Sequence, residues 1–178
     1  MCGIIGYIGD KNAAVIGIDC LKKLEYRGYD SAGIATLNEN KIEIRKDKGK
    51  IGEIREKLRT DDMKGNIAIL HTRWATHGEP TAINAHPHSD CKGEIAIVHN
   101  GIIENYYTLK ELLEKEGHKF ISETDSEVIA HLIEKFYLGN LEEAVFKALK
   151  NIEGAYGLAV IHKNEEKIIA ARRGSPLI

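Results

Sequence analysis

The chain contains little cysteine, no excess of either charge and no long apolar run. Its three cysteines, Cys2, Cys20 and Cys91, show no C-x-x-C spacing, which argues against a disulfide framework or a zinc knuckle. The net charge of -2 supplies no positive field for nucleic acid or anionic lipid. No apolar stretch approaches about 18 residues and no charged segment precedes an apolar one at the N-terminus, so we predict neither a membrane span nor a signal peptide. We expect a reduced, cytoplasmic protein that acts on a small molecule.

The length and composition predict one domain with a sizeable core. The chain has 178 residues, of which 43% are hydrophobic, as in ordinary globular proteins. Thr108 with Glu111, and Thr124 with Glu127, predict capping boxes at two helix starts. The apolar spacing predicts strands at 3–8, 33–37, 41–46, 66–71, 94–99, 156–162 and 167–172, and helices over 12–25, 108–117, 124–136 and 141–152.

The strands are expected to form antiparallel sheets. Two pairs of strands are joined by links too short for a parallel crossover. The centres of two further strands, IAIL at 67–70 and IAIV at 95–98, are continuously apolar, which is typical of strands covered on both faces. These features favour an α+β fold with two packed sheets and helices outside. A single sheet flanked by helices is the alternative, and the pattern alone does not decide between them.

Cys2 directly follows the initiator methionine. Removal of Met1 would leave a thiol and a free α-amine on one residue. An α-amine has a pKa of about 7.7–8.0 and a free thiol one of about 8.5, so the amine can take the thiol proton and later return it to a leaving group. Cys2 is therefore a candidate nucleophile. The alternative is a buried cysteine at the start of a strand.

A polar segment, HTRWATHGEP at 71–80, follows the first central strand. Arg73 offers a planar guanidinium that binds a carboxylate through two hydrogen bonds, and Thr76 and His77 can add further donors. The segment is therefore a candidate carboxylate clamp. As alternatives, Arg73 could form a surface ion pair and Trp74 could belong to the core.

A second polar segment follows the other central strand. Asn100 and Gly101 place a side-chain amide beside an unhindered backbone N–H, which is the composition of a two-donor oxyanion hole. Asn-Gly is also a common turn. Asp125, at the start of a predicted helix, is either an ordinary first-turn acid or a partner for a ligand ammonium. With Arg73 it would recognise an α-amino acid at both charged ends.

The sequence does not indicate a metal or a cofactor. His86 and His88 stand at i and i+2 with only Asp90 and Cys91 close behind, which is poor evidence for zinc. Cys20 and Cys91 are interpreted as structural or incidental. Neither G-x-x-x-x-G-K-[ST] nor G-x-G-x-x-G occurs, so no nucleotide site is predicted.

Longer motifs occur in a fixed order along the chain. They are CGI at 2–4, LEYRGYDSAG at 24–33, HTRWATHGEP at 71–80, NAHPH at 84–88, HNGIIEN at 99–105, SETDSEVIAH at 122–131, GAYGLAV at 154–160 and RRGSPLI at 172–178. Together they resemble the N-terminal glutaminase domain of the glucosamine-6-phosphate synthase family, the isomerising glutamine:fructose-6-phosphate aminotransferases. This is a class II glutamine amidotransferase domain of the N-terminal-nucleophile hydrolase type. The CGI start alone would also fit asparagine synthetase or glutamate synthase.

The resemblance implies roles for the matching residues. Cys2 would attack the side-chain amide of L-glutamine with its own α-amine as the base, releasing ammonia and leaving a glutamyl thioester. Asn100 and the Gly101 N–H would stabilise the oxyanion. The residues implied around the substrate are Arg73, Thr76 and His77 at its carboxylate, Asp125 with the Gly101 carbonyl at its ammonium, His86 near the pocket, and Trp74 at a gate for ammonia.

The resemblance also implies a four-layer αββα sandwich that uses no cofactor. The full-length enzyme would be a homodimer whose isomerase domains hold the fructose 6-phosphate site. Residues 1–178 would then be a partial amidotransferase domain, truncated at its C-terminal end and lacking those domains. The alternative functions are a free-standing thiol amidohydrolase and a glutamine-binding fragment without turnover.

Overall fold

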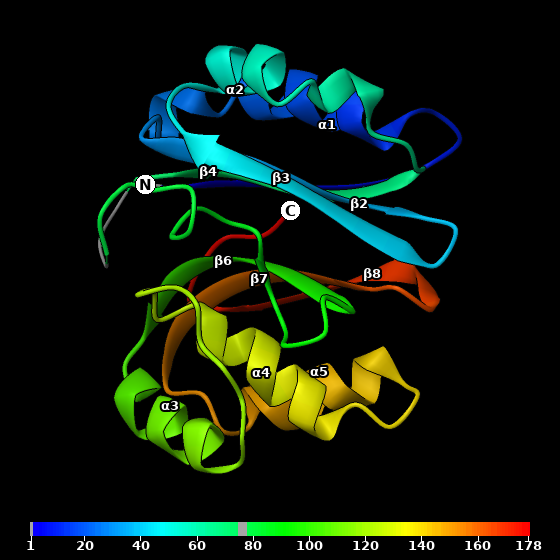
Figure 1. Ribbon diagram of the computed structural model, residues 1–178. Helices are drawn as coiled ribbons and strands as arrows, with labels where there is room; N and C mark the ends of the chain where they lie inside the picture. Colours follow the sequence, from blue (N-terminus) through cyan, green and yellow to red (C-terminus); the bar gives the residue numbers. More distant parts are fainter. Residues whose placement is uncertain (1, 75–77) are drawn as a thin grey trace.

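The computed structural model describes residues 2–74 and 78–178, which form two sheets packed face to face (Figure 1). All paired strands within the two sheets are antiparallel. In spatial order, the first sheet contains β1 (Gly3–Ile8), β4 (Ile67–Arg73), β2 (Ser31–Asn38) and β3 (Lys41–Lys48), and the second contains β5 (His88–Ser89), β6 (Ile95–Ile103), β7 (Gly154–His162) and β8 (Glu165–Arg173).

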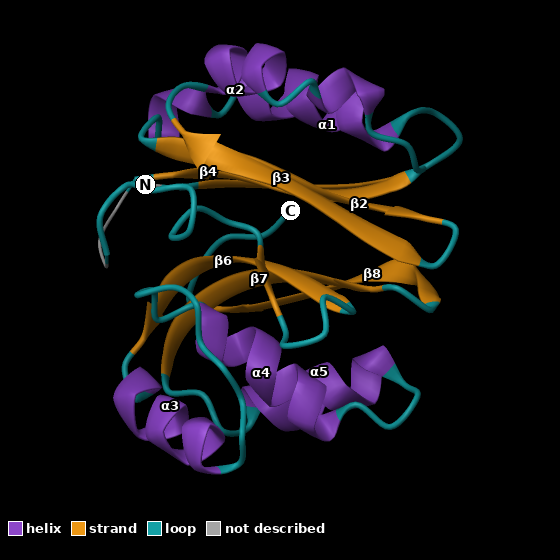
Figure 2. Cartoon of the chain, in the orientation of Figure 1, coloured by secondary structure: helices purple, strands orange, loops and turns teal. Residues whose placement is uncertain are grey.

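Helices cover the outer face of each sheet (Figure 2). The helices are α1 (Ala13–Lys22) and α2 (Ile51–Lys57) on the first sheet, and α3 (Tyr106–Lys115), α4 (Glu127–Phe136) and α5 (Leu141–Leu149) on the second. The predicted four-layer αββα sandwich is thus confirmed, and the single-sheet alternative is wrong. No helix that the structure describes is long and apolar enough to cross a membrane.

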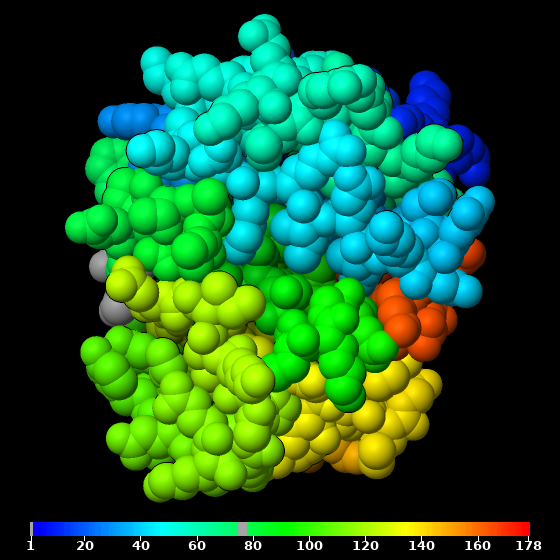
Figure 3. All heavy atoms as spheres, in the orientation of Figure 1, coloured from blue at the N-terminus to red at the C-terminus, as the bar shows by residue number. Residues whose placement is uncertain are grey.

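Three apolar clusters hold the four layers together, and strand alternation creates them. Along β4, Ala68 and Leu70 pack under α1 and α2, whereas Ile67 and Ile69 face the second sheet. The apolar residues of β6 alternate in the same way between the helices α3–α5 and the first sheet. Full burial of each large aliphatic side chain contributes about 1.5–3 kcal/mol. In the space-filling view, side chains of the green part of the chain fill the seam between the two halves (Figure 3).

The predicted capping box of α3 is wrong. The helix begins at Tyr106, two residues before Thr108, and its N-cap is Asn105. The Asn105 side chain bonds the segment before β7, donating to the carbonyl of Asn151 at 2.8 Å and accepting from the N–H of Glu153 at 3.1 Å. Tertiary hydrogen bonds therefore determine where this helix starts.

The predicted capping box of α4 is also wrong. Ser126 is the N-cap and Glu127 is the first helical residue. The Glu127 carboxylate accepts hydrogen bonds from the backbone N–H groups of Ile121 and Ser122 at 2.8 and 2.6 Å. It therefore anchors the segment that enters the helix, and Thr124 bonds elsewhere.

Several short elements, among them α2 and β5, were not predicted from the sequence. The helix α2 has seven residues and the strand β5 has two. Apolar periodicity needs a window of about 11–18 residues to be recognised. Elements this short form because the rest of the fold holds them in place.

Candidate active site

Polar side chains gather where β4 and β6 end, because the alternation of each strand continues into its polar segment. His71 and Arg73 follow Ile69 at even spacing along β4, so they lie on the face that packs against the second sheet. Asn100 follows Val98 in the same way along β6. As a result, Nε2 of His71 lies 2.8 Å from Oδ1 of Asn100, across the two sheets.

Cys2 lies immediately before β1, beside the end of β4. The two strands are antiparallel neighbours in which Gly3 pairs with Thr72. The Cys2 Sγ accepts a hydrogen bond from the backbone N–H of Trp74 at 3.3 Å. Burial raises the pKa of the Cys2 thiol above its usual value. A base is therefore needed to make this thiol a nucleophile near pH 7.

The Asn100 side chain is held in one orientation. Nε2 of His71 lies close to two acceptors, the Asn100 Oδ1 at 2.8 Å and the carbonyl of His99 at 3.1 Å, so it carries the proton and donates it. Burial lowers the pKa of His71 to about 3, which keeps the ring neutral. The Asn100 Nδ2 then points toward Cys2 and donates to its backbone carbonyl at 3.2 Å. The Nδ2 group of Asn100 has a second N–H, which can donate to another acceptor.

Gly101 occupies a position that only glycine fits. Its φ is 140°, and a Cβ there would lie 1.9 Å from the carbonyl oxygen of Ala155 on the neighbouring strand. Residues that carry a side chain rarely adopt this backbone conformation. Gly101 lines the same cavity as Cys2 and Asn100.

Two buried charged side chains line this cavity on further walls. Arg73 and Asp125 are 5% and 4% exposed. Arg73 donates to the carbonyls of Gly78 and Glu79 at 3.2 and 3.4 Å, and Asp125 accepts from the N–H of Ile103 at 2.8 Å through Oδ2. Opposite charges in one cavity suit a small ligand that carries both a carboxylate and an ammonium.

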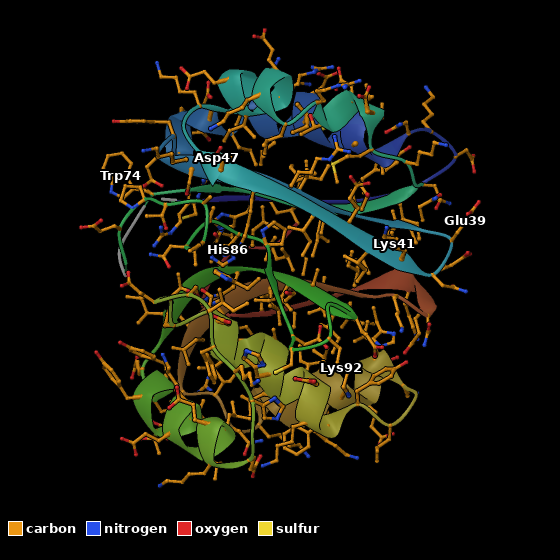
Figure 4. All side chains as sticks on the ribbon, in the orientation of Figure 1. Glu39, Lys41, Asp47, Trp74, His86 and Lys92 are labelled. Carbon is orange, nitrogen blue, oxygen red and sulfur yellow. The ribbon has the colours of Figure 1, made fainter. Side chains whose placement is uncertain are left out.

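The loop before β5 brings His86 between the two sheets (Figure 4). Its ring lies 4.1 Å from the ring of His71 and 4.4 Å from that of His88. Burial lowers the pKa of His86 and of His88 well below the usual value, and it lowers that of His99 to about 4. These four residues, the buried histidines, are neutral near pH 7. His86 also lines the Cys2 cavity.

Lys46, on β3, is a positioning residue that the sequence analysis missed. Its Nζ donates to three backbone carbonyls of the loop before β5, those of Ile83, Ala85 and Pro87, at 3.1, 2.7 and 2.9 Å. Burial lowers the pKa of Lys46 to about 8. The ammonium thereby holds the loop that carries His86. The sequence did contain a sign of this role. Lys46 follows Ile42 and Ile44 at even spacing along β3, which places it on the face toward the second sheet.

Trp74 lies at the edge of the site. Its side chain is 49% exposed at the periphery of the molecule (Figure 4). Its ring meets that of Tyr29 edge to face with the centroids 5.6 Å apart. Its backbone N–H, not its ring, contacts the Cys2 thiol. Thr76 and His77 lie outside the described residues, so their carboxylate contacts stay predictions.

Cys2 lines three cavities, and two of them also share Trp74 and Gly101. One of these two is the cavity with Arg73 and Asp125 on its walls. The other lies toward the C-terminal segment, whose end is drawn between the two sheets in Figure 1. The two cavities share Cys2, Trp74, Asn100 and Gly101. A group released at the thiol therefore has space on the side away from the buried charges.

These groups together suit acyl transfer. A thiol is a nucleophile, and an oriented amide beside a glycine provides donors for a developing oxyanion. The buried guanidinium and carboxylate could orient a charged substrate. This chemistry needs no metal in the Cys2 cavity.

Comparisons with known proteins agree with this description. Residues 71–175, more than half of the chain, match the family described as the glutamine amidotransferase domain. The whole chain is 55% identical to the isomerizing glutamine–fructose-6-phosphate aminotransferase of Clostridium tetani and 57% identical to that of Aquifex aeolicus, covering 29% and 30% of those proteins. The chain thus spans about three tenths of the length of these relatives.

Solved structures share the fold. Glutamine phosphoribosylpyrophosphate amidotransferase from B. subtilis, complexed with ADP and GMP, matches 97% of this chain and 37% of its own with a TM-score of 0.83 and 31% identity. A glutamine aminotransferase class-II domain protein from Silicibacter pomeroyi, 16% identical, matches 84% of this chain and 71% of its own with a TM-score of 0.57. The two-sheet sandwich is therefore common to all three.

Proposed function

Because this chain belongs to the family of glutamine amidotransferase domains, we propose that it hydrolyses the side-chain amide of L-glutamine with Cys2 as the nucleophile. The observation that carries the proposal is one cavity lined by the Cys2 thiol, the oriented amide of Asn100 and the buried charges of Arg73 and Asp125. These groups match the reacting amide and the two charged ends of glutamine.

In the proposed reaction, the α-amine of Cys2 takes the proton of the thiol. The sulfur attacks the side-chain carbonyl carbon of glutamine, and the carbonyl oxygen becomes an oxyanion that accepts hydrogen bonds from Asn100 Nδ2 and the Gly101 N–H. The carbon–nitrogen bond then breaks, and the ammonium of Cys2 returns the proton so that ammonia leaves. Water hydrolyses the glutamyl thioester to glutamate. The raised pKa of the buried thiol supports the need for such a base.

Recognition of glutamine is proposed to use both buried charges. Arg73, with Thr76 and His77, binds the α-carboxylate. Asp125 and the carbonyl of Gly101 bind the α-ammonium. His86 packs behind the pocket as a neutral ring. A guanidinium fork is the better partner for a carboxylate because two parallel hydrogen bonds fix its orientation.

The wider role concerns a longer protein. The relatives named as isomerizing glutamine–fructose-6-phosphate aminotransferases are more than three times as long as the part that this chain matches. We propose that residues 1–178 are the glutaminase part of such an enzyme, a homodimer whose isomerase domains bind fructose 6-phosphate. Ammonia would pass toward that site, with Trp74 at the gate.

The experiment that tests the glutaminase proposal compares two N-terminal forms. The parent chain should lose Met1, react at Cys2 with a diazo-ketone norleucine, and release glutamate and ammonia from glutamine. A variant with lysine inserted between Met1 and Cys2 keeps Met1, because the second residue is large, and its Cys2 nitrogen is an amide. Its rate should fall by about 10²–10⁴, the usual contribution of a general base.

Circular dichroism and the urea midpoint serve as controls that both forms fold alike. Equal glutaminase rates in the two forms would contradict the amine as the base. Glutamine binding by calorimetry, without turnover or labelling in the processed parent, would instead identify a silent glutamine-binding domain.

A further inference from the structure

A second group of chemically reactive side chains lies on the helical side of the second sheet. Cys91 lies in the turn after β5, His118 follows α3, and His131 and Glu134 lie one turn apart on α4. We call these four residues the outer cluster. They line none of the cavities that contain Cys2. Three segments that are distant in the sequence thus bring a thiol, two imidazoles and a carboxylate to one point.

The four ligand atoms have the spacing of a metal site. The Cys91 Sγ lies 3.8 Å from Nδ1 of His118 and 3.5 Å from Nδ1 of His131. The Glu134 Oε2 lies 2.8 and 3.5 Å from the same two nitrogens, and all four atoms lie within 4.8 Å of one another. Tetrahedral bonds to zinc of about 2.3 Å for sulfur and about 2.0–2.1 Å for nitrogen or oxygen separate such ligands by about 3.4–3.6 Å. The observed distances bracket these values.

A neighbouring carboxylate orients one of the imidazoles. Nε2 of His131 lies 3.4 Å from Oε1 of Glu127. An ionised carboxylate accepts hydrogen bonds but donates none. Glu127 therefore favours the tautomer of His131 that has the proton on Nε2 and the lone pair of Nδ1 directed at the cluster. Metal-binding histidines commonly have such a carboxylate partner on their other nitrogen. Glu127 is itself fixed by the N–H groups of Ile121 and Ser122.

The thiol is likewise placed for a metal. The backbone N–H of Lys119 donates to the Cys91 Sγ at 3.3 Å, a contact that stabilises a thiolate. Cys91 is exposed, whereas His131 is almost completely buried, so the cluster is open to solvent on one side and buried on the other. A surface ion pair between His118 and Glu134 would require neither the thiol nor the second imidazole.

We propose that Cys91, His118, His131 and Glu134 bind one Zn²⁺ ion. Sulfur and imidazole nitrogen favour zinc over magnesium or calcium, and four protein ligands leave no open position for catalysis. The ion is structural. It ties the turn after β5 and the segment after α3 to α4, and the chain from His118 into α4 carries Asp125. The proposal is independent of the glutaminase function, and it differs from the interpretation of Cys91 as structural or incidental that the sequence suggested.

The test uses the 178-residue chain, stripped with a chelator and titrated with Zn²⁺ or Co²⁺ alone. The parent should bind one ion per chain, show the intense visible bands of tetrahedral Co²⁺ together with a sulfur-to-cobalt charge-transfer band, and unfold at a higher temperature with zinc. Cys91→Ser and His118→Asn should each weaken Zn²⁺ binding at least about 100-fold, more than loss of an outer partner does. Cys91→Ser should also abolish the charge-transfer band.

Matched controls keep the test decisive. Cys20→Ser and Cys2→Ser should bind zinc as the parent does, because neither thiol belongs to the outer cluster. Cys91→Ser changes an exposed side chain, and its circular dichroism and metal-free urea midpoint should equal those of the parent. The proposal is overturned if the parent binds no zinc at micromolar concentration, if Cys91→Ser binds it equally well, or if Cys2→Ser removes the binding.

Discussion

The Cys2 site and the outer cluster contain the same kinds of side chain in different surroundings. At the Cys2 site the rings of His71 and His88 each contact that of His86. Burial lowers the pKa of His71 to about 3 and that of His99 to about 4, although Asp125 opposes the shift at His99. At the outer cluster the histidines lie beside carboxylates. Despite burial, hydrogen bonds from His131, Ser122 and Ile121 lower the pKa of Glu127 to about 2.

This difference assigns different tasks to similar residues. Where burial dominates, histidine is a neutral spacer and donor, as His71 is toward Asn100. Where carboxylates surround it, histidine has one nitrogen fixed as a donor and the other available as a ligand, as His131 has beside Glu127. The burial and the nearest acid, rather than the residue type, determine what a histidine can do.

A chain of side-chain hydrogen bonds connects the two regions. His88 Nε2 lies 3.1 Å from the Thr124 hydroxyl, which lies 3.0 Å from that of Ser122. The Ser122 hydroxyl donates to Glu127, whose other oxygen contacts His131. The segment before α4 therefore borders both sites, and Asp125 belongs to it.

The largest expected effect separates the three cysteines. Cys2→Ala should lower the glutaminase rate on the order of 10⁶-fold, because removing a nucleophile disables the remaining catalytic groups. Cys20→Ala, which changes a thiol on α1 away from both sites, should retain the parent rate. Ammonia release from glutamine measures both. Substantial activity in Cys2→Ala would mean that the nucleophile lies elsewhere.

The next effect concerns the buried charges of the Cys2 site. Arg73→Ala and Asp125→Asn should each raise the activation free energy for glutamine by about 2–5 kcal/mol, because a ligand charge loses its partner in a partly desolvated cavity. Arg73→Lys should recover little of this loss. Lysine cannot reproduce the guanidinium fork. kcat/KM with glutamine and with analogues blocked at the carboxylate or the amine measures this.

Each variant should discriminate less than the parent against the analogue that lacks its own partner group. Equal turnover of glutamine and both blocked analogues by the parent would contradict both assignments. It would favour a generic thiol amidohydrolase instead.

A slightly smaller effect is expected at Asn100. Asn100→Ala should lower kcat by about 10²–10³, with little change in KM, because the amide acts where negative charge develops. The urea midpoint should be measured beside the kinetics, since the Asn100 side chain also bonds Cys2 and His71. A rise in KM with kcat unchanged would place Asn100 among the groups that hold the substrate.

The smallest effect sharpens the comparison of histidines. Unfolded histidine takes a proton below about pH 6.5, whereas folded His71 and His99 do so only near pH 3 and 4. The unfolded state therefore binds more protons as the pH falls from 6.5, and the free energy of unfolding should decrease by about 1.4 kcal/mol per pH unit for each buried histidine.

Urea unfolding between pH 6.5 and 5.5 measures this slope before the carboxylates contribute. His71→Asn should reduce the slope by one histidine's share, whatever its effect on stability at pH 7.5. A parent slope near zero would show that these histidines are protonated in the folded protein.

Much of the fold followed from the pattern of residues alone. The continuously apolar centres of β4 and β6 predicted strands covered on both faces. The structure confirms this for β4, because Ile67 and Ile69 face the second sheet whereas Ala68 and Leu70 face the helices. The helix starts at Tyr106 and Glu127 could not be predicted from this pattern, because hydrogen bonds to distant segments replaced the local caps.

The sequence by itself determined which strands are covered on both faces and which residue is the candidate nucleophile, because a continuously apolar run and an N-terminal cysteine are local properties. The tertiary structure alone decided which polar residues meet. Lys46 supports the loop of His86 from another strand, and Cys91 reaches His118 and His131 across 27 and 40 residues of chain. No local spacing encodes such contacts, because they arise only when packing of the sheets and helices fixes the separate segments in space.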